Sequence, residues 1–506
     1  MPVAESYFCA CRCVSCDGGR AICGKDLPHY QCRVAPSGCS ESDKHRVHVA
    51  ECVSASKSYL ALVWLFYSFF WMRLWAKSLS ASSSSVYLHL HVHATQLFLS
   101  SPGSQPALTE VSQGLLRLKR GEDRRIRAGH PWVFSNEVDT KVTPLSVLTP
   151  GALVQVHSSR DEFLGHAYVN PHALICARIL GRDPRQPPDA ALIAHRLKVA
   201  LALRECLSQE PYYRLVFGES DGLPGLVLDR YGEVLVGQIA TAGMEALKGV
   251  VEEAIGETLR PMGLFWKNDS SARELEHLPQ TAEVAFGAVP EELQVRESGL
   301  SFAAPLREGQ KTGWFYDQTA NRQRLLRYLP PGARVLDVCS YAGAWAVTAL
   351  KNGASRALCI DASELALQFV RRNADANGVA VETLRADAFE ALRQLHEAGE
   401  RFDVVILDPP AFIKRKKDIP QGQAAYRKLN QLALSLMEGE GLLVSCSCSY
   451  HLAADDLAAA LQGAARHTGR FVQILEMGGQ SPDHPVHPAI PETRYLKAFF
   501  CRATRE

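Results

Sequence analysis

The sequence lacks the glycine-rich loops that proteins use to hold phosphates. One strand–turn–helix segment offers a place for such a loop, but a single glycine, Gly343, stands at the turn that follows Asp337. The dinucleotide fingerprint G-x-G-x-x-G is therefore absent, and no P-loop lysine is present. These absences argue against a ligand that is held mainly through its phosphates.

Paired metal-binding cysteines are lacking as well. Eight of the fifteen cysteines lie between Cys9 and Cys52, but no C-x-x-C…C-x-x-C framework is formed. A zinc site is therefore the less favoured interpretation, and we predict no metal. The other seven cysteines lie mostly in apolar, strand-like runs, which suits reduced thiols in a cytoplasmic protein.

Residues 1–114 contain no apolar run of membrane-spanning length. The run 59–72 ends before Arg73 and is shorter than the ~20 residues that a span needs. It also lies too far from the first residue for an ordinary signal peptide, and a serine-rich stretch follows it. Three interpretations stay open: an anchor, a targeting segment, or an extension from an early start codon. We favour the last, with residues 1–114 disordered or non-native and no membrane association.

A strong charge imbalance is also absent, since the formal net charge is +1. Bulk charge therefore does not indicate a nucleic-acid partner, and local patches must carry that argument. One patch lies at residues 117–127, which contain six basic residues and two acidic ones. It is either a solvated face or a phosphate-binding face, and the charges alone leave both open. The candidate RNA contacts in this patch are Arg124, Arg125 and Arg127.

Two small domains are predicted in the first part of the remaining chain. Alternating short strands predict a β domain over residues 115–187. A Pro-Pro linker and a helix-forming stretch then begin an α+β domain over residues 188–297. Its turn contains Glu219 and Asp221, which could be catalytic, although we favour local hydrogen bonds that hold a Gly/Pro turn.

From residue 298 onward, apolar runs end on acidic or nucleophilic residues. Such runs are typical of buried parallel strands, which are covered by helices on both faces. Ligands of these α/β sheets bind beyond the carboxyl ends of the strands. We therefore expect five side chains to meet at one crevice: Asp337, Asp361, Asp387, Asp408 and Cys448.

An acid at a strand end and a lone glycine suit a ligand with a nucleoside and a cation, such as S-adenosylmethionine. Asp361 could accept both ribose hydroxyls and Asp387 the adenine amino group. Each acid alone is better explained as a cap or turn residue, but three at successive strand ends favour a cofactor. The cofactor-binding candidates are Asp337, Ser340, Tyr341, Gly343, Asp361, Asp387, Ala388 and Asp408.

The last two strand ends carry groups suited to chemistry on a base. Asp408 precedes two prolines, which make a rigid, extended loop, and could hold or protonate a ring nitrogen. Cys448 could add to carbon 6 of a pyrimidine, which would make carbon 5 nucleophilic. Such a thiol needs an electropositive or helix-terminal setting. A buried structural cysteine is the alternative, and Cys446 shares its strand parity.

Basic and aromatic residues flank these strand ends. The run 414–417 is either a phosphate grip or a mobile charged loop. The connector 309–318 has three adjacent aromatics and is either a lip over the site or a plain hairpin. A base treated in this way must leave its stack, so the RNA must be single-stranded or flipped. The further substrate-binding candidates are Lys311, Gln318, Arg322, Pro409, Pro410, Lys414, Lys416 and Tyr426.

From about Leu115 to its end, the chain resembles the RlmI-type large-subunit ribosomal RNA cytosine-5 methyltransferases. The matching segments are residues 129–134, 219–225, 311–313, 317–318, 337–343, 408–410, 447–449 and 483–485. The resemblance implies an N-terminal PUA RNA-binding domain and a class I methyltransferase domain at residues 298–506, with a doubly wound seven-stranded sheet. It further implies S-adenosylmethionine as cofactor, Cys448 as nucleophile and large-subunit ribosomal RNA as partner. A homodimer stays open.

Two other functions remain as alternatives. A guanine-N7 ribosomal RNA methyltransferase is one, because a related group shares the Asp-Pro-Pro motif. A non-catalytic RNA-binding factor in ribosome assembly is the other. Methylation of a ring nitrogen does not need Cys448, whereas the intact set of five strand-end residues argues against lost catalysis.

Overall fold

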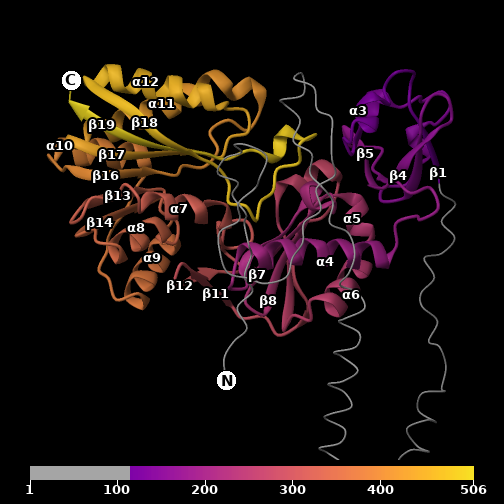
Figure 1. Ribbon diagram of the computed structural model, residues 1–506, viewed down its shortest axis with the longest axis horizontal. Helices are drawn as coiled ribbons and strands as arrows, with labels where there is room; N and C mark the ends of the chain where they lie inside the picture. Colours follow the sequence, from indigo (N-terminus) through magenta and orange to yellow (C-terminus); the bar gives the residue numbers. More distant parts are fainter. Residues whose placement is uncertain (1–113, 506) are drawn as a thin grey trace, which may run out of the picture. The chain divides into compact units, whose positions relative to one another are not determined.

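The computed structural model describes residues 114–505, which form three sheets and a hairpin (Figure 1). The cysteine cluster at residues 9–52, the apolar run 59–72 and the rest of the expected extension up to residue 113 lie outside the described residues. Within the described part of the chain, no helix is long and apolar enough to cross a membrane. All seven cysteines of this part are free thiols.

The first sheet has five strands in the order β1-β3-β4-β5-β2. Its strands are β1 (Gly114–Arg117), β2 (Trp132–Phe134), β3 (Leu153–His157), β4 (Phe163–Val169) and β5 (Ile175–Gly181), and a short helix, α3 (Arg124–Arg127), lies between β1 and β2. Apolar side chains from alternate strand positions fill one core, to which α3 adds Ile126. The period-two alternation read from the sequence is clear in β3, whereas β4 and β5 are buried along nearly their whole length.

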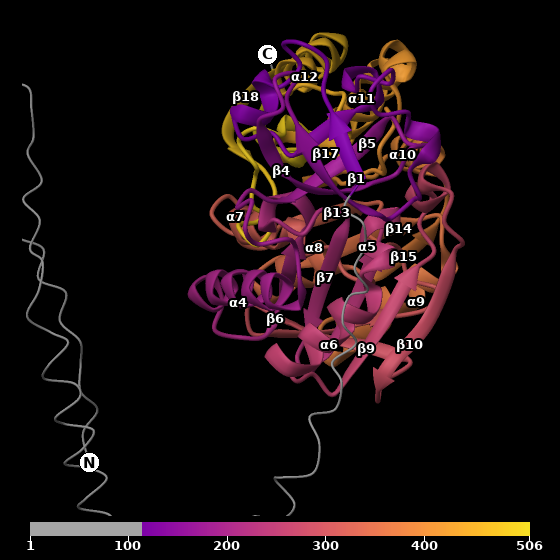
Figure 2. The same cartoon turned by 90° about the vertical axis from the view of Figure 1, so that its right-hand side faces the viewer.

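The second sheet also has five strands, in the order β10-β9-β8-β7-β6 (Figure 2). Its strands are β6 (Tyr212–Phe217), β7 (Leu226–Tyr231), β8 (Val234–Ile239), β9 (Gly263–Asn268) and β10 (Thr281–Gly287). Helices α4 (Ala190–Leu207), α5 (Ala242–Ala246) and α6 (Lys248–Thr258) pack their apolar side chains into the same core as the sheet. Gly237 is required there, because a Cβ atom would lie 2.3 Å from the Trp266 ring.

A hairpin of β11 (Glu292–Glu297) and β12 (Leu300–Pro305) comes next in the chain. Its apolar side chains share one core with Phe265 of the second sheet and with Phe369 of the next helical layer. Asn373 also bonds to both the N–H and the C=O of Ala303 at its edge, at 2.7 and 3.0 Å. The hairpin therefore joins the second sheet firmly to the third, and the expected boundary at residues 297–298 falls inside it.

The third sheet confirms the expected doubly wound fold with seven strands, ordered β15-β14-β13-β16-β17-β19-β18. The strands are β13 (Arg334–Val338), β14 (Arg356–Asp361), β15 (Glu382–Arg385), β16 (Phe402–Leu407), β17 (Met437–Ser447), β18 (Arg470–Gly478) and β19 (Lys497–Arg505). Only β19 runs antiparallel to its neighbours. The strand order reverses between β13 and β16, and that switch point is where such sheets bind ligands.

Helices cover both faces of the seven-stranded sheet (Figure 1). One face packs against α7 (Thr319–Leu325), α8 (Ala344–Lys351) and α9 (Glu364–Ala376). The other packs against α10 (Ala388–Glu397), α11 (Ile419–Ser435) and α12 (Ala454–Thr468). This double cover explains why the strands read as continuous apolar runs rather than as alternating ones.

Candidate active site

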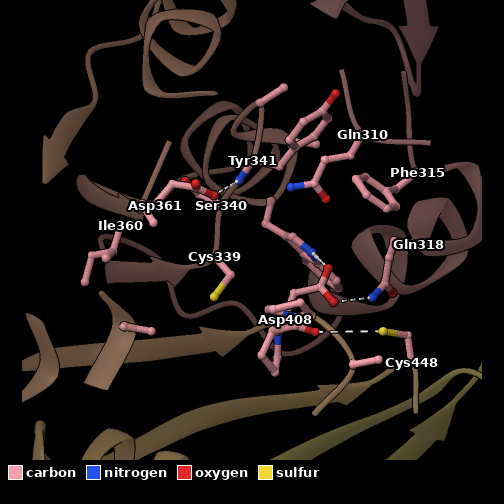
Figure 3. A pocket seen from close by; sticks show the side chains of 18 of the residues that line it. Gln310, Phe315, Gln318, Cys339, Ser340, Tyr341, Ile360, Asp361, Asp408 and Cys448 are labelled. Atoms are coloured by element: carbon pink, nitrogen blue, oxygen red, sulfur yellow. Dashed lines mark hydrogen bonds between the residues drawn. The ribbon is translucent and has the colours of Figure 1, made fainter. Parts of the chain in front are cut away.

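A cavity of about 450 Å³ lies at the switch point of the seven-stranded sheet (Figure 3). Residues after β13, β14 and β15 line one part of it, which we call the cofactor side. Residues after β16 and β17, together with the segment 310–318, line the other part, which we call the nucleophile side. Figure 3 shows Asp361 and Tyr341 on the first side and Gln318 and Cys448 on the second.

The turn after β13 shapes the cofactor side. Cys339 and Tyr341 have φ angles of 62° and 49°, and Gly343 has 79°. Two non-glycine residues with left-handed backbone in one turn are uncommon and mark a strained segment. The turn is fixed from outside, because the Tyr341 N–H donates to Asp361 Oδ2 at 3.0 Å and its hydroxyl donates to the Gly313 carbonyl at 2.8 Å.

Asp337 lies beneath this turn, and it is not among the residues that line the cavity. Its Oδ2 accepts from the N–H of Ala346 at 3.2 Å, while its Oδ1 is buried without a hydrogen-bond partner. Burial, with the nearby Asp408 carboxylate, raises the pKa of Asp337 to about 8. The expected cofactor contact is thus replaced by a supporting position under the start of α8.

Asp361 and Asp387 both line the cavity, but from different settings. Asp361 ends β14, and its two oxygens accept from the Tyr341 and Ser363 N–H groups. Since a carboxylate oxygen has two lone pairs, both oxygens can still accept from a ligand. Asp387 does not end a strand as expected: β15 stops at Arg385, and Asp387 caps α10 by accepting from two of its backbone N–H groups at 2.9 and 3.2 Å.

The lining of the cofactor side fits a nucleoside with a cationic centre. Apolar residues Ile360, Ala362, Ala388 and Phe389 line the cavity together with Asp361. An apolar slot suits an adenine ring, and a carboxylate at its edge suits ribose hydroxyls.

Asp408 stands between the two sides. Its Oδ1 accepts from Gln318 Nε2 at 2.8 Å and its Oδ2 from Trp345 Nε1 at 3.1 Å. Gln318 is itself oriented, because its Oε1 accepts from Asn321 Nδ2 at 2.6 Å. Burial raises the pKa of Asp408 to about 6, so this carboxyl group can exchange a proton near neutral pH.

Cys448 lines the nucleophile side, whereas Cys446 does not reach the cavity. The thiol of Cys448 points to the Pro409 carbonyl, with an Sγ–O distance of 3.9 Å. Cys446 is only 1% exposed and packs inside β17 against the core. Strand parity could not distinguish the two cysteines, but their positions do: Cys448 lines the cavity, and Cys446 is buried in the core.

The setting of Cys448 is less electropositive than the chemistry was expected to need. Burial raises the pKa of its thiol, and the Asp408 and Asp317 carboxylates raise it further. Lys311 acts in the opposite direction and lowers it. Because burial is the largest of these effects, the thiol holds its proton in the protein alone.

Several expected RNA contacts are already engaged in ion pairs. Arg125 pairs with Glu137 at 2.6 Å, and Arg127 pairs with Asp123 and Glu162. Among the expected RNA contacts in the described part of the chain, Arg124, Lys414 and Lys416 are exposed, and no ion pair of theirs is found. The structure thus divides the basic residues into paired ones and ones whose charge is open to solvent.

Two expected RNA contacts are almost fully buried, although Arg322 still lines the cavity. Tyr426 is 0% exposed, because its ring packs in the core of the sheet. Arg322 is 2% exposed and holds both oxygens of Glu297 at 2.5 and 2.7 Å. An aromatic or basic residue near a strand end carries no mark in the sequence that tells a surface contact from a buried support.

The connector 309–318 is not a hairpin, and only part of it forms a lip. Phe315 lines the cavity, and the Lys311 ammonium lies 4.6 Å from the centre of its ring. Trp314 also reaches the cavity wall but is mostly buried, and Tyr316 is buried with its hydroxyl donating to the Arg230 carbonyl at 2.9 Å. The two prolines after Asp408 line the cavity as well, with Pro410 the more exposed.

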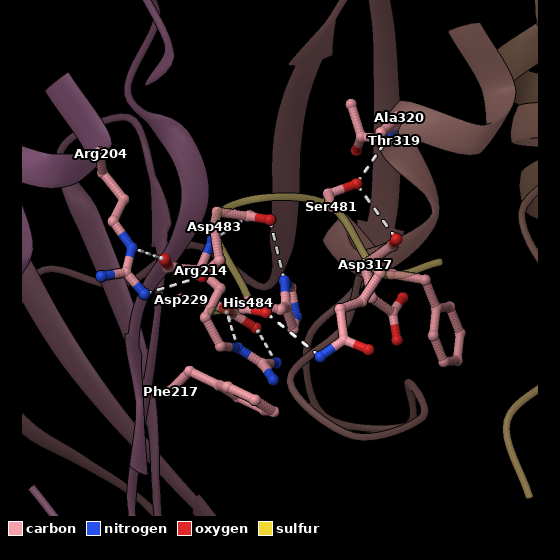
Figure 4. Close-up of polar contacts among 12 residues, drawn as sticks. Arg204, Arg214, Phe217, Asp229, Asp317, Thr319, Ala320, Ser481, Asp483 and His484 are labelled. Atoms are coloured by element: carbon pink, nitrogen blue, oxygen red, sulfur yellow. Dashed lines mark hydrogen bonds and ion pairs between the residues drawn. The ribbon is translucent and has the colours of Figure 1, made fainter. Parts of the chain in front are cut away.

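The loop before β19 ties the second sheet to the nucleophile side (Figure 4). Asp483 accepts from the Arg214 N–H at 2.9 Å, and its carbonyl accepts from Arg204 at 2.7 Å. Two residues earlier, the N–H and hydroxyl of Ser481 both donate to the carbonyl of Asp317, at 2.9 and 3.1 Å. The loop is thus hydrogen-bonded both to the second sheet and its helix and to Asp317 in the cavity wall.

The acids of the turn 219–225 belong to this supporting frame. Asp221 holds the Arg204 guanidinium with both oxygens, at 2.6 and 2.7 Å. Glu219 accepts from the indole of Trp132 in the first sheet at 2.9 Å. Neither lines the cavity, so the structural interpretation of this turn fits better than the catalytic one.

Sequence reasoning gave no role to three residues that shape the nucleophile side, although Asp317 lies in one of the matching segments. Trp345 donates to Asp408, Asp317 lines the cavity, and the Lys497 ammonium lies behind Cys448, donating to the Ser449 carbonyl at 2.5 Å. Only Lys497 had a signal in the sequence, as a lone cation at the start of the apolar run 498–501. The other two act through contacts that no local pattern predicts.

Comparison with known proteins decides the family. Residues 116–182 match the PUA-like domain, and residues 275–501 match the S-adenosylmethionine-dependent methyltransferases. A ribosomal RNA large subunit methyltransferase I of Aliivibrio fischeri is 35% identical over 392 residues, which are 76% of this chain and 98% of the relative. The chain belongs to this methyltransferase family. The corresponding protein of Shigella boydii is 34% identical over 395 residues and covers the same shares.

Solved structures agree with the family in fold. A SAM-dependent methyltransferase from Streptococcus mutans has 19% identity and a TM-score of 0.66, over 77% of this chain and 100% of its own. Another methyltransferase, complexed with SAH, also has 19% identity and a TM-score of 0.67 over the same shares. S-adenosylmethionine is the methyl donor of the family, and the lining of the cofactor side fits it.

Proposed function

We propose that the chain transfers a methyl group from S-adenosylmethionine to carbon 5 of a cytosine in large-subunit ribosomal RNA. The family relationship supports ribosomal RNA as the substrate. The observation that carries the choice of carbon 5 is the Cys448 thiol in the cavity wall, across from the cofactor side. A pyrimidine carbon 5 is a weak nucleophile, and a thiolate added at carbon 6 activates it.

The proposed reaction uses a covalent bond between Cys448 and the base. The thiolate adds to carbon 6, and the electron pair of the 5,6 double bond moves to carbon 5. When bound, S-adenosylmethionine supplies an electrophilic methyl group, which carbon 5 attacks with release of S-adenosylhomocysteine. A base then removes the carbon 5 proton, and the double bond re-forms as the thiolate leaves.

Asp408 has the properties of the group that holds the cytosine ring. Its pKa of about 6 lets it share a proton with a ring nitrogen near neutral pH. Gln318 and Trp345 fix the orientation of its carboxylate. Protonation of the ring would draw electrons from carbon 6 and so favour attack by the thiolate. The Cys448 thiol would have no role in a guanine-N7 methyltransferase, because methylation of a ring nitrogen needs no thiol.

The remaining assignments follow from this reaction. We propose residues 115–187 and 188–297 as the RNA-binding β domain and the α+β domain, and residues 298–506 as the catalytic domain. Three exposed basic residues would hold phosphates: Arg124 in the β domain, and Lys414 and Lys416 in the catalytic domain. The target base would leave its stack to enter the cavity.

The test is to map methylated bases in ribosomal RNA from cells with and without the protein. The proposal expects a large-subunit cytosine that carries a 5-methyl group only when the protein is present. Restoring the protein with the substitution Cys448→Ala should leave that cytosine unmethylated. Loss of a 7-methylguanine instead would establish the alternative reaction, and an unchanged RNA would favour the non-catalytic one.

A further inference from the structure

The segment that carries Cys448 is held by a buried polar network. Tyr426 accepts a hydrogen bond from the Ser447 hydroxyl at 2.9 Å and bonds to the Ser449 hydroxyl at 3.0 Å. The N–H of Ile413 donates to the same Ser449 hydroxyl at 3.1 Å. The residues on both sides of the thiol are therefore fixed by α11 and by the loop after β16.

Lys497 completes this network from the opposite strand. In the antiparallel pairing of β17 with β19, Lys497 stands directly across from Ser447. Its Nζ donates to the carbonyl of Ser449 at 2.5 Å and to that of Tyr495 at 2.8 Å. An ammonium group has three donors, so these two carbonyls leave one of them. The segments that carry the family resemblance do not include this lysine, and it does not line the cavity.

The charge of Lys497 is not cancelled by a carboxylate. Among the described residues, the ion pairs include none with Lys497, and the two acceptors of its ammonium are carbonyl oxygens. The side chain is partly buried, where a charge acts over a distance with little screening. Burial lowers the pKa of Lys497 to about 8, while the neighbouring Cys448 thiolate opposes that change.

The other charged groups around Cys448 do not supply a net positive setting. On the cavity side Lys311 is half exposed and lies 4.0 Å from Asp317, which limits its effect on the thiol. Asp408 and Asp317 both oppose thiolate formation. The hydroxyls of Tyr426 and Tyr495 are uncharged near neutral pH, because burial raises their pKa values. Lys497 is thus the partly buried cation behind the thiol that no carboxylate neutralises.

We propose that Lys497 is a positioning residue that fixes the Ser447–Cys448–Ser449 segment and stabilises the Cys448 thiolate from behind the cavity. The proton of the thiol leaves to solvent, and the ammonium remains charged. The proposal rests on the proposed role of Cys448 as nucleophile. It assigns two separable contributions to Lys497: hydrogen bonds that place the segment, and a positive charge that favours the thiolate over the thiol.

The test measures thiol ionisation without RNA. The full chain is treated with iodoacetamide between about pH 6 and about pH 10, and mass spectrometry follows alkylation of Cys448, because only the thiolate reacts. Lys497→Met should slow alkylation about tenfold at neutral pH, where the ammonium is charged, and by less above about pH 8, where the unchanged protein loses that charge as well. Lys497→Arg should keep the rate at neutral pH near that of the unchanged protein, and Cys448→Ala identifies the labelled peptide.

Lys497→Gln separates the two contributions. A glutamine amide can still donate to the Ser449 carbonyl but carries no charge. The proposal expects the same slower alkylation at neutral pH as for Lys497→Met, with S-adenosylmethionine binding unchanged by calorimetry. An unchanged rate at neutral pH in the Gln variant would overturn the proposal, even if the Met variant fails to fold. Since no RNA is present, this result is independent of whether carbon 5 of cytosine is the target.

Discussion

The two sides of the cavity are built in different ways. On the cofactor side, Asp361 ends β14 and Asp387 follows β15, and each accepts from a backbone N–H two residues further along the chain. On the nucleophile side, Cys448 is held by side chains of Tyr426 and Lys497, which come from another helix and another strand. The first side is a repeated local motif, and the second is a single long-range assembly.

This difference predicts that the two sides can be damaged separately. A change on the cofactor side should weaken donor binding and leave the thiol as it is. A change on the nucleophile side should stop or slow the chemistry and leave donor binding intact. Four substitutions test how the two sides are built, from the largest expected effect to the smallest.

Cys448→Ala should lower methyl transfer by on the order of 10³-fold or more, because the other thiol that lines the cavity, Cys339, lies on the cofactor side. Binding of S-adenosylmethionine, measured by calorimetry, should stay the same. Cys446→Ala is the matched control, since this cysteine is buried two residues away. Cys446→Ala should retain activity. An inactive Cys446→Ala together with an active Cys448→Ala would show that Cys446 is the nucleophile.

Asp361→Ala should weaken binding of S-adenosylmethionine by about 10- to 100-fold, the usual effect of losing hydrogen bonds to a charged group. The rate of Cys448 alkylation should not change, because the carboxylate lies on the other side of the cavity. Asp387→Ala serves as a comparison, because its carboxylate caps α10. Equal losses of donor affinity in both variants would show that the cap matters as much as the strand-end acid.

Asp337→Asn should flatten the dependence of stability on pH. The pKa of Asp337 rises from 3.8 to about 8 on folding, so the folded protein binds more protons than the unfolded chain within that window. The free energy of unfolding therefore falls as pH increases from about 4 to about 8. Melting temperatures across this range should fall by a few °C less in the variant. An identical slope in both proteins would mean that Asp337 is ionised in the fold.

Tyr426→Phe should have the smallest effect, a several-fold lower kcat, because it removes only the hydroxyl that orients Ser447 and Ser449. KM for RNA should not change, since the ring is buried. A raised KM with unchanged kcat would instead indicate that Tyr426 contacts the RNA. Steady-state kinetics with one RNA preparation is sufficient to distinguish these results.

The same difference explains how far the sequence could predict the site. Strand ends appear in the sequence as apolar runs that stop on a polar residue, so the fold, the crevice and the position of Cys448 were predictable. The burial of Tyr426 and Arg322 was not predictable, because burial depends on contacts with distant segments. Lys497 went unnoticed for the same reason: its importance comes from the strand pairing with Ser447, which is 50 residues away in the chain.

The most direct test of the account is covalent trapping. Ribosomal RNA made with 5-fluorocytidine carries fluorine in place of the proton that must leave carbon 5, so the bond from Cys448 to carbon 6 cannot be released. With S-adenosylmethionine present, the unchanged protein and Cys446→Ala should form a stable protein–RNA adduct on a denaturing gel, and Cys448→Ala should form none. An adduct that persists in Cys448→Ala, or no adduct in the unchanged protein, would contradict nucleophilic attack by Cys448.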